Sequence, residues 1–280
     1  ENTLWILGLV SPLPRRMDWY APQTEARLRE SSELIGPPQF AAMVGFGSAL
    51  KMAFALPTLY RARKNADGKT LAQVLPPDLY ARWARLRLQY LPSNDAVEEW
   101  RPQFAALALY DAAIKSAGLD NDHKISERVY SLADGLKLRK TSSTISFEVS
   151  DPRRLAKSFA DTPVDDAACF RSVLDQLDSD VREAAARANA WAVGDLPELA
   201  RLAGRSDESC INAFLQVQAV RDMGMQDALP RARQKWLAAV DAALSANRST
   251  FAMLPVKDLL ASDGVLATLR AKGYVVEAPE

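Results

Sequence analysis

The stretch Leu4-Trp5-Ile6-Leu7-Gly8-Leu9-Val10 is a continuous apolar run near the start of a chain of 280 residues. The run is short, and Ser11-Pro12 ends it at once. This combination is typical of a strand that is buried on both faces of a parallel sheet. We therefore expect the run to form a central strand of a β-sheet.

Further strand signals lie near residue 145 and at the carboxyl end of the chain. Residues 143–149 alternate polar and apolar side chains, and 250–256 and 274–277 have the pattern of strands. Helical patterns occupy 22–34, 39–118, a segment from 152, 180–193, 208–223, 231–246 and 262–272, with a polar loop at 118–124. The sequence predicts an α/β (α+β) fold with a central β-sheet built from both chain ends and flanked by helices. We expect one domain over 1–280, with a mainly helical region at about 39–135 inserted.

The charge balance narrows the classes of function. Thirty-five basic residues match 35 acidic ones, so no cationic excess is present to neutralise phosphates, and nucleic acid is not an expected partner. No apolar run approaches the roughly 18 residues of a membrane span. The chain has one histidine, His123, which excludes mechanisms that need two.

The cysteines and the first residue bear on the cellular compartment. Cys169 and Cys210 are 41 positions apart and are either bridged or two buried thiols, and the sequence leaves both alternatives open. The first residue is Glu1 rather than Met, as expected of a processed precursor or a trimmed chain.

Four segments resemble the TraB/GumN family. The opening strand, Leu4–Gly8, is similar to the family's strand before a Gly-Thr-x-His motif. Ala188–Asp195 resembles a Trp-x-x-Gly-Asp segment, and Arg233–Trp236 resembles an Arg-Asn-x-x motif. Phe251–Leu254 together with Asp263–Glu277 looks like the closing block. The resemblance is spread over nearly the whole chain.

The resemblance implies a metallohydrolase-like site, since the family is related to the TIKI metalloproteases, the erythromycin esterases and the haem-binding ChaN proteins. Such a site is expected to use two histidines, acidic residues and an arginine. Here Ser11 and Asp258 stand where the resemblance places the two histidines, whereas Glu148 and Arg233 match retained positions. The acidic residue expected after the first helix is replaced around Pro37.

The sequence allows more than one interpretation of Asp258, Glu148 and Arg233. Asp258 and Glu148 could offer oxygens to Mn²⁺ or Mg²⁺, but Lys257 beside Asp258 favours a salt bridge, the commoner fate of such a pair. Arg233 could hold an anion or pair with Asp227 or Glu148.

Two other motifs have weaker chemical readings. To act as a nucleophile, Ser11 would need a base within hydrogen-bond reach. The single histidine, His123, lies in a polar turn, so the simpler interpretation is that Ser11 ends a strand. Gly45-Phe46-Gly47-Ser48 resembles half a phosphate-binding loop without its Gly-Lys-Ser/Thr, which favours the start or kink of a helix.

These observations predict a TraB/GumN-like bacterial protein that is periplasmic or otherwise exported. Its metallohydrolase site would be degenerate, and it would act as a pseudoenzyme that binds a small molecule, a glycan or a protein without a cofactor. The alternative is an active metal-dependent hydrolase, peptidase-like or esterase-like, with a site rebuilt from Ser11, Glu148, Arg233 and Asp258 around Mn²⁺ or Zn²⁺. A third reading is a structural or assembly protein.

Overall fold

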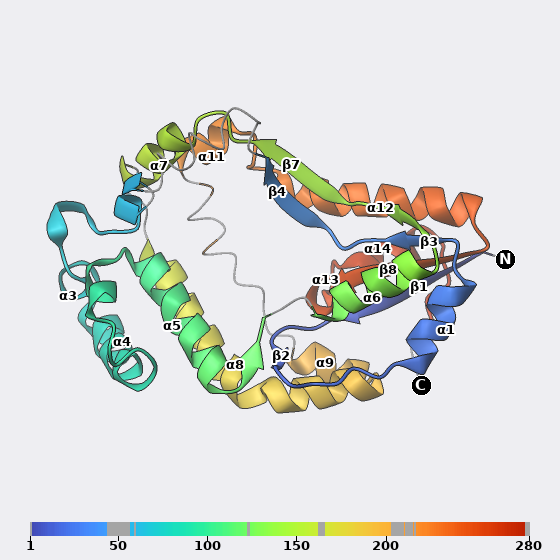
Figure 1. The fold of residues 1–280 in the computed structure, drawn as a ribbon, viewed down its shortest axis with the longest axis horizontal. Coiled ribbons are helices and arrows are strands. Elements are labelled where there is room, and N and C mark those ends of the chain that lie inside the picture. The colour runs from blue at the N-terminus through green and yellow to red at the C-terminus, as the bar shows by residue number, and fades with distance from the viewer. Residues whose placement is uncertain are drawn as a thin grey trace.

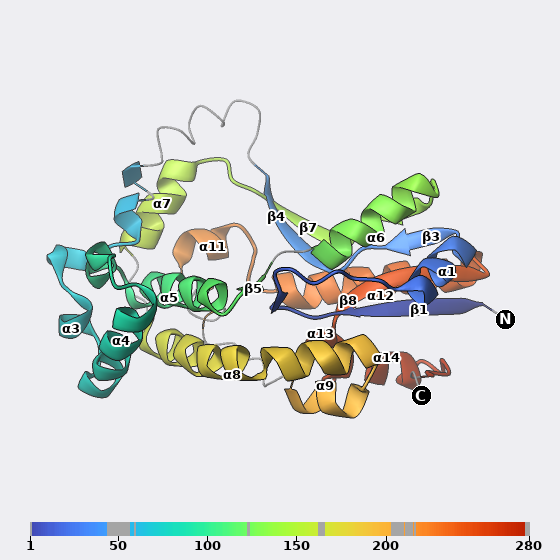
Figure 2. The same ribbon diagram turned by 60° about the horizontal axis from the view of Figure 1, so that its bottom comes forward.

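The structure is a computed structural model that describes residues 2–43, 57–58, 60–121, 124–161, 166–202, 210, 215 and 217–277. The element expected at Gly45–Ser48 and the turn at His123 lie outside the described residues. Figures 1 and 2 show a part built around a β-sheet at one end of the molecule and a helical part at the other.

The central sheet has four strands in the order β1–β8–β3–β6, and all neighbouring pairs are parallel. The strands are β1 (Thr3–Leu9), β8 (Ser249–Pro255), β3 (Glu33–Ile35) and β6 (Arg139–Thr141). In the register of the sheet, Gly8 lies opposite Leu254 and Leu34 lies opposite Phe251. Both ends of the chain therefore supply neighbouring strands, which confirms the predicted α/β fold.

The expectation that residues 4–10 form a central strand is wrong. Within the described residues β1 is the edge strand of the sheet, and its side chains from Leu4 to Leu9 are only half-buried. The central position belongs to β8, in which every residue from Thr250 to Leu254 is buried. An apolar run shows that a strand is covered, but its position in the sheet depends on which strands pair with it.

Helices cover both faces of the central sheet, as Figure 2 shows. They are α1 (Pro22–Glu30), α6 (Lys124–Gly135) and α12 (Ala228–Ala246). Trp236 and Val240 of α12 join the core cluster on one face of β8. Leu28 of α1 and Val129 of α6 join the cluster on the opposite face. The apolar stripe of each helix is buried against the sheet, which holds the sheet in the middle layer.

A second, two-stranded sheet continues from the central one. It consists of β4 (Gln39–Met43) and β7 (Thr144–Glu148), which pair in parallel with Phe40 opposite Ile145. The strand predicted at 143–149 is confirmed, but the helical pattern predicted from residue 39 is wrong for β4. A short apolar run does not distinguish a strand from a helix, and here pairing with β7 decides.

The helical part is built on α4, α5 and α8. Apart from the helices that cover the sheet and the two that follow β8, the described α-helices are α3 (Leu71–Val74), α4 (Pro77–Tyr90), α5 (Pro102–Ser116), α7 (Pro152–Asp161), α8 (Asp166–Val193), α9 (Leu196–Leu202) and α11 (Gln218–Asp222). Trp83 of α4 and Phe170 of α8 lie in one core cluster, with ring centroids 5.6 Å apart. Cys169 of α8 forms a disulfide with Cys210, so the structure selects the bridged alternative.

Other boundaries differ from the sequence predictions. The helix expected over 22–34 ends at Glu30, since the chain turns there into β3, and the helix expected over 180–193 is the second half of α8. Part of the helix expected at 208–223 lies outside the described residues. The helical signal at 262–272 corresponds to α14 (Val265–Ala271), which follows α13 (Val256–Leu260).

The closing strand expected at 274–277 is wrong, because this segment forms no strand. Tyr274 and Val276 instead pack against the core cluster between α12 and the sheet. The polar loop predicted at 118–124 contains β5 (Leu119–Asp120), which pairs antiparallel with β2 (Leu13–Pro14).

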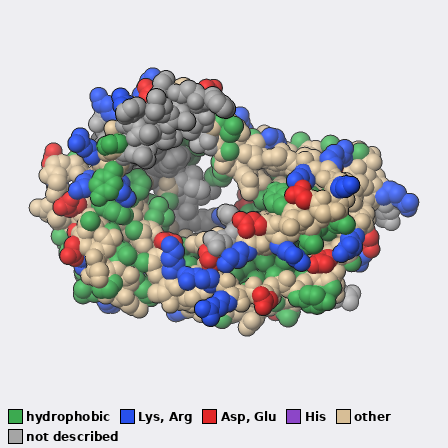
Figure 3. Space-filling model, viewed as in Figure 1, with side chains coloured by type: hydrophobic (Ala, Val, Ile, Leu, Met, Phe, Trp, Pro, Cys, Tyr) green, Lys and Arg blue, Asp and Glu red, His purple; other side chains and the backbone are tan. Residues whose placement is uncertain are grey.

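The described helices and the described surface have two general properties. Among the described residues, no helix combines the length and the apolar character needed to cross a bilayer. Basic and acidic side chains are mixed over the described part of the face seen in Figure 3. The described part of this face therefore carries charges of both signs.

Candidate functional site

Ser11 and Asp258 follow the ends of two neighbouring strands. Ser11 comes two residues after β1, and Asp258 lies on α13, three residues after the end of β8. In the register of the sheet Leu9 is opposite Pro255, so the two strands end together. The structure therefore brings Ser11 and Asp258 to the same carboxyl end of the sheet, where α/β folds commonly place their sites.

Asp258 has two cationic neighbours. Burial by the surrounding protein raises the pKa of its carboxyl group, and the charges of Lys257 and Arg233 oppose this shift without cancelling it. The side chain nevertheless reaches solvent. The Arg233 guanidinium donates to the carbonyl oxygen of Asp263 and, over 3.1 Å, to the hydroxyl of Thr268. Arg233 thus ties α12 to the loop before α14 while its charge acts on Asp258.

Glu148 lies elsewhere. It is the last residue of β7, it is exposed, and it sits opposite Met43 of β4. The carboxyl end of β7 and helix α13 are apart in both Figure 1 and Figure 2. The expected pairing of Arg233 with Asp227 is also not seen, because Asp227 contacts Arg231 at 3.6 Å. The structure does not bring Glu148 to the other predicted positions.

The carboxyl ends of β1 and β8 are covered by the end of α8 and by α9. The indole Nε1 of Trp191 donates to the carbonyl oxygen of Gly8 over 2.6 Å. Leu199 of α9 and Val256 of α13 are buried in one cluster, against which Val10 packs. Apolar side chains therefore line the space directly beyond these two strands.

Ser11 is exposed and makes a polar contact. Its hydroxyl donates to the side-chain oxygen of Asn121 over 3.1 Å. An amide oxygen accepts a hydrogen bond but does not remove a proton, so this contact positions the hydroxyl without activating it.

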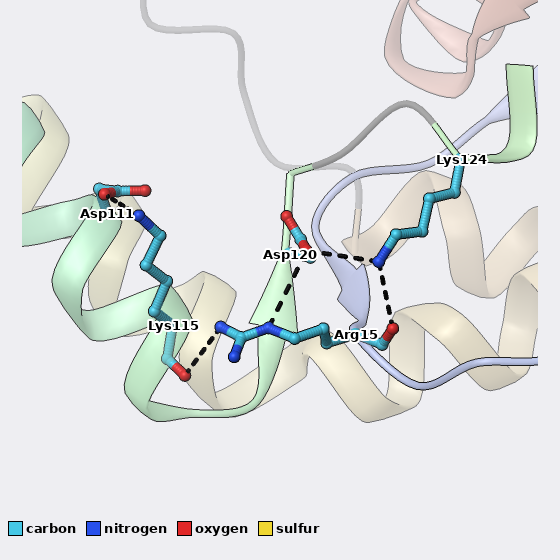
Figure 4. A network of polar contacts seen from close by, with 5 residues as sticks. All are labelled: Arg15, Asp111, Lys115, Asp120 and Lys124. Carbon is cyan, nitrogen blue, oxygen red and sulfur yellow. Dashed lines mark hydrogen bonds and ion pairs between the residues drawn. The ribbon is translucent and has the colours of Figure 1, made fainter. Parts of the chain in front are cut away.

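A network of ionic contacts surrounds the β2–β5 pair, as Figure 4 shows. The ammonium group of Lys124 lies 3.5 Å from the carboxylate of Asp120 and donates to the carbonyl oxygen of Arg15 over 3.3 Å. The guanidinium of Arg15 lies 3.9 Å from the same carboxylate and donates to the carbonyl oxygen of Lys115 over 3.4 Å. Asp120 therefore links the segment after β2 to the start of α6.

A pocket of about 210 Å³ opens beside this network, between the segment that follows β2 and helix α6. Its apolar lining includes Leu13, Met17, Trp19 and Ile125. Its charged lining includes Asp18, Asp120, Lys124 and Arg128. The pocket combines an apolar wall with charges of both signs, and small-molecule sites likewise join apolar surface to placed polar groups.

Sequence reasoning missed this pocket. The only local signal was the spacing of Asp120 and Lys124, which is that of neighbours on a helix. The residues of the pocket come from two segments about 100 positions apart, which the pairing of β2 with β5 and the ionic contacts around Asp120 bring together. No pattern within either segment predicts that contact.

Fold and site together define an α/β protein with a parallel sheet made from both chain ends and with polar residues gathered beside its carboxyl end. A profile of the TraB/PrgY/gumN family matches residues 1–278, which is nearly the whole chain. The chain therefore belongs to the TraB/PrgY/gumN family. Neither the curated proteins nor the solved structures gave a significant match.

Proposed function

We propose that this protein is an exported, periplasmic binding protein in which the metallohydrolase site expected from the family resemblance has degenerated. It binds a small molecule, a glycan or a protein and does not hydrolyse it. One observation carries the proposal: the carboxylate of Asp258, at a position where the resemblance places a histidine, faces the cations Lys257 and Arg233. Positive neighbours repel a divalent metal ion.

The available donors fit a divalent ion poorly. Zinc sites use about four nitrogen, sulfur or oxygen ligands, and harder ions use six or more oxygens. Asp258 and Ser11 share one end of the sheet, but the hydroxyl of Ser11 bonds to Asn121, and Glu148 lies at the end of another sheet. Across the described residues, no three His, Cys, Asp or Glu side chains gather as a metal site would require.

The disulfide supports the proposed location. Cys169 and Cys210 are bridged, and such bonds form and persist in the periplasm and outside the cell, whereas the cytosol keeps thiols reduced.

The raised pKa of Asp258 favours the alternative, a hydrolase with a rebuilt site. A carboxyl group whose pKa is raised by burial is a candidate general acid or base, and such groups concentrate at active sites. In that case Ser11, Glu148, Arg233 and Asp258 would act together with Mn²⁺ or Zn²⁺, which requires Glu148 to approach α13.

The test compares thermal unfolding of metal-stripped protein with Mn²⁺, Mg²⁺ or Zn²⁺ added, and assays peptide and ester cleavage in the same samples. An ion at 100 times its dissociation constant would stabilise the fold by about 2.7 kcal/mol, which is readily measured. We expect no specific shift and no cleavage. The matched variants are Asp258→Asn and Asp263→Asn, an exposed carboxylate of the same region. Metal-dependent cleavage that disappears only in Asp258→Asn would establish the hydrolase instead.

A further inference from the structure

Two charged groups that line the pocket are poorly paired within the protein. Among the described residues, Asp18 has no ion-pair partner, and the partner of Arg128 is Glu25 at the long distance of 3.6 Å. Both Asp18 and Arg128 are exposed. A guanidinium carries five N–H donors, so a single long contact leaves most of its hydrogen-bonding capacity for another group.

The other two charged side chains of the pocket are already engaged. Lys124 and Asp120 lie 3.5 Å apart, and both also contact Arg15. A ligand that paired with either of them would have to compete with this network. The charges open to a ligand are therefore one carboxylate, Asp18, and one guanidinium, Arg128.

The apolar wall of the pocket is held in place from behind. Leu13 and Ile125 are buried in one cluster, against which Met17 and Trp19 pack. The ring of Trp19 stacks on that of Trp191, with centroids 6.2 Å apart. A wall that is fixed before binding costs little conformational entropy when a ligand is bound.

The size of the pocket limits the ligand. A cavity of about 150 Å³ in another protein holds benzene, which has six carbon atoms. By simple proportion, a pocket of about 210 Å³ holds eight or nine non-hydrogen atoms.

We propose that this pocket binds a small zwitterion with an aliphatic body, a free amino acid of the size of leucine. Its ammonium group pairs with Asp18, its carboxylate pairs with Arg128, and its aliphatic chain lies on the wall formed by Leu13, Met17 and Trp19. A molecule with one charge leaves the other protein group unpaired. The proposal rests on the proposed binding function but uses neither Asp258 nor Arg233.

Calorimetric titration of the whole protein tests the ligand class with three compounds. They are L-leucine, 4-methylpentanoate, which lacks the ammonium group, and 3-methylbutylamine, which lacks the carboxylate. We expect leucine to bind about tenfold or more tightly than either analogue, because each charge-assisted hydrogen bond contributes about that factor. Equal binding of the three compounds, or no binding of leucine at millimolar concentration, would overturn the proposal.

Two variants locate the site. Asp18→Asn should lower the affinity for leucine about tenfold and leave the affinity for 4-methylpentanoate unchanged. Arg128→Gln should lower the affinity for both of these compounds and leave the affinity for 3-methylbutylamine unchanged. Asp67→Asn and Arg248→Gln, which change exposed residues outside the pocket, are the matched controls. Arg128→Lys, with thermal unfolding of every variant, separates loss of binding from loss of fold. Leucine binding that survives both Asp18→Asn and Arg128→Gln contradicts the assignment.

The result is independent of the test for the proposed function. If leucine does not bind while the protein remains without metal-dependent cleavage, only the ligand assignment fails. If the protein cleaves peptides with a metal ion, the binding function itself fails, whatever leucine does.

Discussion

The indole nitrogen of Trp191 donates a hydrogen bond of 2.6 Å to the carbonyl oxygen of Gly8, across 183 positions of the sequence. Both residues lie in segments that resemble TraB/GumN motifs. A side chain at position 8 would place its Cβ 2.7 Å from a methyl group of Val256, so only glycine fits without a shift. The motif glycine and tryptophan therefore serve one purpose, which is to hold the end of β1 between α8 and α13.

We predict that Trp191→Phe destabilises the protein by about 1–2 kcal/mol, because the partly buried carbonyl of Gly8 loses its donor. The aromatic ring can still stack on Trp19, so the variant isolates the N–H group. Urea unfolding measures the change. Trp5→Phe changes a half-buried tryptophan on β1, the strand that contains Gly8, and is the control for the smaller ring. An unchanged unfolding free energy would show that water replaces the indole.

Glu33 should make the stability of the protein depend on acid. Burial alone would raise the pKa of this carboxyl group, but hydrogen bonds from Thr141, Arg139 and Asn247 lower it overall. A carboxyl group with a lowered pKa in the folded state stabilises the protein above the ordinary value of 4.5. That contribution is lost as the pH falls through the folded-state pKa.

Glu33→Gln should therefore cost about 2 kcal/mol at neutral pH, and the difference in stability from the wild type should shrink as the pH falls below the ordinary value of 4.5. Denaturant unfolding from pH 7 to pH 3 measures both quantities. Glu30→Gln, whose exposed carboxylate pairs with Arg27, should change stability by less than about 1 kcal/mol. A difference that grows on acidification contradicts the direction of the pKa shift.

The disulfide should stabilise the helical part. Replacing Cys169 and Cys210 together by serine removes a cross-link over 41 positions, for which chain entropy predicts about 4 kcal/mol. Thermal unfolding should show a lower midpoint for the double variant. Reductant should lower the wild-type midpoint and leave the double variant unchanged. If reductant lowered the unfolding midpoint of both proteins, the change would not be caused by reduction of the Cys169–Cys210 disulfide.

Asp180 holds a buried charge. Its carboxylate pairs with the guanidinium of Arg187 at 2.9 Å and accepts a hydrogen bond of 2.5 Å from Tyr110. Asp180→Asn leaves the buried guanidinium uncompensated and should cost about 3–5 kcal/mol in a denaturant titration. Asp178→Asn, two positions away on the same helix, breaks an exposed contact with Arg82 and should cost less than about 1 kcal/mol. Similar losses of unfolding free energy in the two variants would show that burial of the Asp180–Arg187 pair does not determine the cost.

Some of the architecture could be predicted because it depends on local patterns. The alternation at 143–149 and the strand pattern at 250–256 correspond to β7 and β8, and the helical pattern at 231–246 corresponds to α12. Strand β7 buries one face, β8 is buried on both faces and α12 buries one stripe, and each requirement is visible in the order of apolar and polar side chains.

The strands β3, β4 and β6 could not be predicted in this way. Each has five residues or fewer, and the helical patterns predicted at 22–34 and 39–118 overlap β3 and β4. Pairing between distant segments stabilises strands this short, and a pattern within a few residues does not report the partner.

The candidate site could also be predicted only in part. The resemblance named Ser11, Glu148, Arg233 and Asp258, and the structure places Ser11 and Asp258 at one end of the sheet and Arg233 beside Asp258. Glu148 follows a strand that leaves the central sheet. Nothing in the residues around Glu148 indicates that β7 pairs with β4 and not with β8.

The sequence by itself determined the mixed α/β character of this protein, its balanced charge, its family and the absence of a second histidine. These are properties of composition, periodicity and short motifs, and they do not require knowledge of distant contacts. Only the tertiary structure decided that β8 and not β1 is central, that Cys169 and Cys210 are bridged, and that Asp18 and Arg128 line one pocket. Each of these depends on which distant segments pack together, and packing is settled by the free energy of the whole chain.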